Sequence, residues 1–95
     1  MAAAKKAHEV VSARVAQLLR EEREKRKLSM NLVAERAGLS QQMVSYVERS
    51  MRNPTLETLL RISDAMEVDF VTLLQKAIES AGTRQILRHK KAQHS

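Results

Sequence analysis

Apolar residues recur along this chain at helical spacing and do not alternate with polar residues. In the segment from about residue 8 to 27, Val11, Val15, Leu18 and Leu19 stand at i, i+4, i+7 and i+8. That spacing places all four side chains in one stripe on an α-helix. Because no useful window has the period-two alternation of a strand, the pattern predicts an all-α fold.

Capping residues and helix breakers divide the rest of the chain into four more helices. Ser29 and Ser40 are plausible N-caps for helices over about 30–37 and 41–49. The fourth helix runs from Thr55 to about Met66, and the fifth lies between Asp69 and Gly82. The core candidates on the fourth helix are Leu56, Leu59, Ile62 and Met66. On the fifth helix, helical spacing groups Phe70, Leu73, Leu74, Ala77 and Ile78.

The short joint between the second and third helices is the most informative feature. Gly38, Leu39 and Ser40 leave so little chain that the two helices must cross steeply, as in a helix-turn-helix. Gly38 suits the left-handed backbone at the end of a helix, and Leu39 is expected to fill the corner. The residues expected to pack inward at the crossing are Val33, Ala34, Ala37, Val44 and Val47.

The third helix has one polar side that carries no carboxylate. At about 100° per residue, Val44, Val47 and Met51 fall on one side, and Glu48 lies close to them. The other side holds Gln42, Ser45, Tyr46 and Arg49, with Gln41 at the exposed N-terminal end. Such a face suits the major groove of DNA, where Gln pairs with adenine and Arg with guanine.

The segment "LREEREKRKLSMNLVAERAGLSQQMVSYVERSMRNPTLETLLRISDAMEVDFVTLL", Leu19 to Leu74, resembles the Cro/CI-type (XRE) helix-turn-helix regulators of bacteria and phages. The resemblance implies a compact five-helix domain of the lambda-repressor type, usually dimeric, whose third helix reads operator DNA. It assigns base reading to Gln41, Gln42, Ser45, Tyr46 and Arg49. It assigns phosphate contacts to Ser29, Asn31, Ser40, Arg52 and Asn53, and an ion pair to Arg23 and Glu48.

Three positions depart from the family pattern. Met30 stands where the family often has Gln, and methionine cannot donate to a phosphate. Lys27 and Ser50 stand where glycines are common, and Ser50 is expected to strain its turn by about 1 kcal/mol.

Composition narrows the class of protein. The 95 residues carry a net charge of +6 and contain no cysteine, which suits one small domain in a reducing cytoplasm and a polyanionic partner. We expect a flexible segment at 1–7, the DNA-binding domain at 8–80 and a basic tail at 81–95. His8, His89 and His94 lack the neighbours of a metal site, so no metal, cofactor or enzymatic activity is expected.

The resulting hypothesis is a cytoplasmic, nucleoid-associated regulator of bacterial or phage origin that binds a pseudo-palindromic operator as a homodimer. We expect the regulator to be a repressor, although the sequence does not distinguish repression from activation. Leu74, Ala77 and Ile78 are the expected dimer contacts, with Ile86 and Leu87 extending them, and a closed monomer is the alternative. Alternative functions are an antitoxin or antirepressor that masks a protein partner, and a restriction–modification controller protein.

Overall fold

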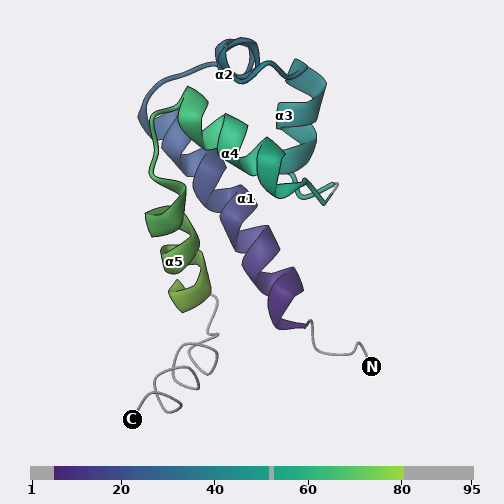
Figure 1. The fold of residues 1–95 in the computed structure, drawn as a ribbon, viewed down its shortest axis with the longest axis vertical. Helices are drawn as coiled ribbons and strands as arrows, with labels where there is room; N and C mark the ends of the chain where they lie inside the picture. The colour runs from purple at the N-terminus through teal and green to yellow at the C-terminus, as the bar shows by residue number, and fades with distance from the viewer. Residues whose placement is uncertain (1–5, 52, 81–95) are drawn as a thin grey trace.

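The computed structural model describes residues 6–51 and 53–80, and within these residues the chain forms five α-helices and no strand (Figure 1). The predicted all-α, five-helix fold is therefore confirmed. None of the described helices combines the length and apolar character that crossing a membrane would require. The helices are α1 (Ala7–Lys25), α2 (Met30–Ala37), α3 (Gln41–Glu48), α4 (Leu56–Ala65) and α5 (Phe70–Ser80).

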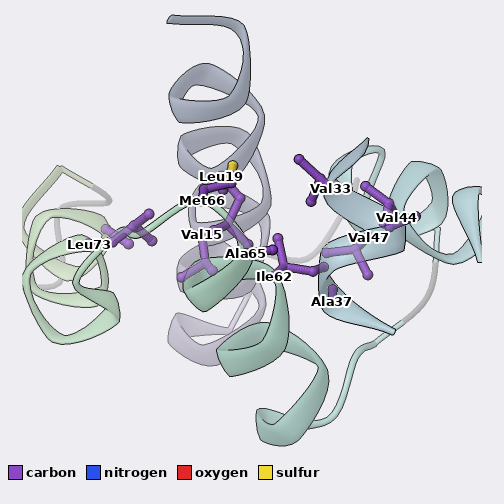
Figure 2. Close-up of a cluster of buried hydrophobic side chains, with 12 residues drawn as sticks. Val15, Leu19, Val33, Ala37, Val44, Val47, Ile62, Ala65, Met66 and Leu73 are labelled. Atoms are coloured by element: carbon purple, nitrogen blue, oxygen red, sulfur yellow. The ribbon is translucent and has the colours of Figure 1, made fainter. Parts of the chain in front are cut away.

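The long helix α1 is the axis of the domain. Helix α5 packs along α1, while α2 packs against both α3 and α4 at the other end of the molecule (Figure 1). Figure 2 shows the core between these helices, where Leu19 of α1 and Ile62 of α4 lie fully buried. The helix-turn-helix unit contributes Val33, Val44 and Val47 to the same cluster. The unit is thus attached to the domain through its own apolar side.

Four helices end in the same left-handed turn, and only one of these turns has glycine. Gly38 has φ 71°, whereas Lys27, Ser50 and Glu67 have φ 58°, 56° and 58°. In each turn the next apolar residue donates its N–H to a carbonyl five residues earlier, which satisfies the helix end. These bonds are Leu28 to Arg23 (3.0 Å), Leu39 to Ala34 (2.9 Å), Met51 to Tyr46 (2.9 Å) and Val68 to Ser63 (2.9 Å).

Two residues that were predicted to be buried are exposed, so these two predictions are wrong. Met51 is 59% exposed, because α3 ends at Glu48 and the left-handed turn at Ser50 turns the chain away from the helical wheel. Leu56 is 62% exposed, because it is the first residue of α4 and lies before the part of that helix that contacts the core. Leu59, Ile62 and Met66, in the same apolar stripe, do pack in or against the core.

Candidate nucleic-acid interface

At the crossing of α2 and α3, Ala34, Gly38 and Leu39 have the roles that the sequence predicted. Ala34 is only 2% exposed where the two helices meet, and Leu39 packs against the core cluster. The Arg61 guanidinium of α4 donates from Nη1 to the Ala37 carbonyl over 3.2 Å. A Cβ on Gly38 would lie 3.1 Å from that same nitrogen. The turn is therefore held from outside as well as by its own backbone.

Sequence reasoning missed this role of Arg61. Its only local signal is Glu57 one turn earlier, which predicts an ordinary surface pair, and that pair is present at 2.8 Å. The contact to α2 spans 24 residues of sequence, so no local pattern announces it.

The inner side of α3 is fixed by two valines and by an ion pair. Val44 and Val47 are at most 1% exposed. Beside them, Glu48 accepts from Arg23 of α1 in a forked arrangement, with Nε–Oε2 at 2.7 Å and Nη2–Oε1 at 3.1 Å. Arg23 also donates from Nη1 to the Leu28 carbonyl at 2.9 Å. The hydrogen bond and charge of Glu48 raise the pKa of Arg23, against the opposing effect of burial.

The outer side of α3 is polar and accessible. Gln41, Gln42 and Arg49 are exposed, while Ser45 and Tyr46 are half-buried. The Gln42 amide donates from Nε2 to the Tyr46 hydroxyl one turn away. No carboxylate lies on this side, because the only acid of α3, Glu48, points inward to Arg23. Four of the five residues predicted to read bases thus lie on α3, and Arg49 lies just beyond its last turn.

The four predicted phosphate-contacting residues that the structure describes lie at or just before helix N-termini. The hydroxyls of Ser29 and Ser40 cap α2 and α3 by accepting from the N–H groups of Leu32 and Met43, each at 3.0 Å. Asn31 lies exposed in the first turn of α2. Asn53 is exposed just before α4, which Thr55 caps at 3.1 Å. Met30, the departure from the family pattern, packs against the core instead of facing outward.

Some predicted residues lie outside the described part of the chain. These are Arg52, the apolar pair Ile86 and Leu87, and the segments 1–5 and 81–95. Within the described residues, no group of three His, Cys, Asp or Glu side chains is placed to hold a metal ion.

The predicted dimer residues divide between two sides of α5. Ala77 is completely buried against the rest of the chain, so its assignment to a dimer surface is wrong. The physical reason is that α5 packs along α1, and this contact uses the side that carries Leu73 and Ala77. Leu74 and Ile78 remain half-buried, and Val71 is 71% exposed. Val71, Leu74 and Ile78 stand at i, i+3 and i+7 and form a second, outward stripe.

Leu74 also borders a groove of about 530 Å³ between α1, α4 and α5, which Ser50, Asn53 and Pro54 also line. Apolar side chains in its lining include Val11, Leu56, Leu59 and Phe70. Leu74 therefore belongs both to the lining of this groove and to the second stripe of α5.

Curated proteins of bacteria resemble this chain. Uncharacterized HTH-type transcriptional regulators of Mycobacterium tuberculosis are 36% identical over 70 residues, covering 72% of this chain and 50% of theirs. This chain thus spans about half the length of those relatives. The HTH-type transcriptional regulator y4dJ of Sinorhizobium fredii is 40% identical over 63 residues, covering 65% of this chain and 82% of its own.

A solved structure has the same fold. The restriction-modification controller protein C.AhdI from Aeromonas hydrophila superposes with a TM-score of 0.61 and 32% sequence identity, over 72% of this chain and 98% of that one. The family described as Helix-turn-helix (HTH_3) matches residues 19–73, the stretch that includes the turn at Gly38 and both helices beside it. With its motif intact in sequence and in structure, the chain belongs to this XRE-type helix-turn-helix family.

Proposed function

We propose that this protein is a sequence-specific DNA-binding transcriptional regulator that inserts the outer side of α3 into the major groove. The observation that carries the proposal is the two-sided character of α3. Its inner side is held by Val44, Val47 and the Arg23–Glu48 ion pair, and its outer side has only polar and cationic groups. A rigid helix with a carboxylate-free polar side is what direct readout of base edges requires.

In this proposal Gln41, Gln42, Ser45, Tyr46 and Arg49 contact base edges. The N-terminal ends of α2, α3 and α4 bind the phosphates that flank the groove, because a helix N-terminus offers unpaired N–H groups and a positive dipole end. The side chains assigned to these phosphate contacts are Ser29, Asn31, Ser40, Asn53 and, from sequence alone, Arg52.

We further propose that two copies assemble through the outward stripe of α5 and the groove beside it. The proposed interface contains Leu74 and Ile78 from the original prediction. It adds Val71 and omits Ala77. A two-fold dimer would place its third helices in successive major grooves, about 34 Å apart, on a pseudo-palindromic operator. Exposed apolar side chains that cluster in this way commonly mark a protein contact.

The resemblance to C.AhdI favours one specific role, that of a restriction–modification controller, because it extends over 98% of that protein. A gene for a restriction enzyme or a DNA methyltransferase beside this one would support that role, and its absence would remove it. The bacterial sources of the relatives support a cytoplasmic regulator of bacterial origin, and the family supports a role without catalysis.

Selection of bound DNA from a random pool is the direct test. We expect one enriched motif with two-fold symmetry and half-sites about one helical turn apart. Gln42→Ala should relax that motif and weaken binding by roughly 1–3 kcal/mol. The matched control is Gln17→Ala on the exposed surface of α1, which should leave the motif unchanged. A pool without enrichment would contradict the proposal.

The assembly is tested separately by mass in solution. Val71→Glu places a charge on a side chain that is already 71% exposed, so the fold should survive while the dimer dissociates. Leu74→Asp is the less specific variant, because Leu74 also packs against the core. A Val71→Glu protein that keeps the mass of a dimer would move the interface elsewhere.

A further inference from the structure

Two of the side chains on the outer surface of α3 are joined to each other. Gln42 and Tyr46 stand one helical turn apart, and the Gln42 Nε2 donates a hydrogen bond to the Tyr46 hydroxyl oxygen. Gln42 is exposed, whereas Tyr46 is half-buried on a helix whose inner side is fully packed. Because Tyr46 is the more buried of the two, its hydroxyl fixes the position of the exposed Gln42 amide.

This bond determines what the amide can offer to a base. An exposed glutamine has three side-chain torsions. It can therefore direct either its amide oxygen or its amide nitrogen toward a given atom of a base. With Nε2 directed toward Tyr46, the amide keeps one N–H and the Oε1 acceptor for a ligand. In the major groove, adenine alone presents an acceptor (N7) next to a donor (N6) that match this pair.

We propose that Tyr46 is a specificity-determining positioning residue that orients the Gln42 amide for adenine in each half-site. This inference rests on the proposed function and deepens it by naming the base and the residue that controls its readout. Fixing the amide before binding removes the cost of ordering a rotamer-rich side chain in the complex. The gain appears only at the base pair that Gln42 contacts, so Tyr46 acts on discrimination more than on total affinity.

The test is a double-mutant cycle on DNA binding. The probes are the selected operator and three duplexes in which the base pair that Gln42→Ala relaxes is replaced by each alternative. Wild type should prefer adenine there, and Gln42→Ala should cut that preference about tenfold or more. Tyr46→Phe, which keeps the ring and removes only the hydroxyl, should cut it about three- to tenfold.

The decisive variant combines both changes. If Tyr46 acts through Gln42, Gln42→Ala with Tyr46→Phe should discriminate no worse than Gln42→Ala alone. Ser45→Ala is the matched control, since it also deletes one hydroxyl from this surface but has no bond to Gln42 in the structure. Its effect should add to that of Gln42→Ala.

Two results would separate the possible failures. Additive effects of Gln42→Ala and Tyr46→Phe, or a Tyr46→Phe protein with unchanged discrimination, would overturn the positioning role while leaving the regulator proposal standing. A pool with no enriched motif would remove the regulator proposal itself. Gln42→Glu tests the same contact by a gain of function. A carboxylate at this position can only accept hydrogen bonds, so the preference should shift from adenine to cytosine, whose N4 amino group donates.

Discussion

Replacing Glu48 with alanine should destabilise the domain far more than removing an exposed charge from α1. The Arg23 and Glu48 side chains are only 11% and 3% exposed, and two hydrogen bonds join them. Glu48→Ala leaves the guanidinium buried with one remaining partner, the Leu28 carbonyl. Breaking such a pair from one side costs about 3–5 kcal/mol. A domain of this size has roughly 5–15 kcal/mol in total.

The assay is thermal and urea unfolding followed by helical circular dichroism, at one fixed protein concentration because assembly would alter the midpoint. For a domain of this size, each kcal/mol lowers the melting temperature by about 4–8 °C, so a fall of about 12 °C or more is expected. The control is Glu24→Ala. Its partner Arg20 lies at 3.2 Å, but both side chains are more than half exposed, so the loss should stay below about 1 kcal/mol.

A third variant tests the cause of the loss. Arg23→Met combined with Glu48→Leu removes both charges and keeps apolar volume, so it should recover at least half of the stability that Glu48→Ala loses. Because pairing raises the pKa of Arg23, its contribution is complete below the ordinary guanidinium pKa and is lost only in stronger base. Equal losses of stability in Glu48→Ala and Glu24→Ala would refute the burial of the Arg23–Glu48 pair as the source of the effect.

Three further variants test the turns, each by urea unfolding. Ser50→Gly should stabilise the domain by about 1 kcal/mol, because φ 56° is strained for any residue with a Cβ. The same change at Ser12, inside α1, should destabilise it by about 0.5 kcal/mol, and equal signs at the two sites would contradict the argument. Gly38→Ala should cost about 1–2 kcal/mol through the left-handed backbone, and a neutral result would refute this. Arg61→Ala should cost up to about 1.5 kcal/mol, whereas no loss would mean that its bond to α2 adds nothing.

The candidate site shows where sequence reasoning ends. The exposed polar side of α3 follows from helical periodicity, since Val44 and Val47 on one side leave Gln42 and Tyr46 on the other. The hydrogen bond between Gln42 and Tyr46 does not follow from it. An i, i+4 spacing permits this contact, but rotamers and neighbouring packing decide whether it forms.

The amino-acid sequence by itself determined the number of helices, their approximate ends and the tight turn at Gly38, because apolar spacing, N-caps and Gly38 act over a few residues. Only the tertiary structure decided which of two apolar stripes on α5 faces α1. Both stripes repeat at helical spacing, and packing chose the one with Leu73 and Ala77. It also decided that Arg61 supports the turn at Gly38 and that Met51 lies outside the core. Such outcomes depend on partners distant in sequence and on the direction of a left-handed turn, and neither is encoded in local periodicity.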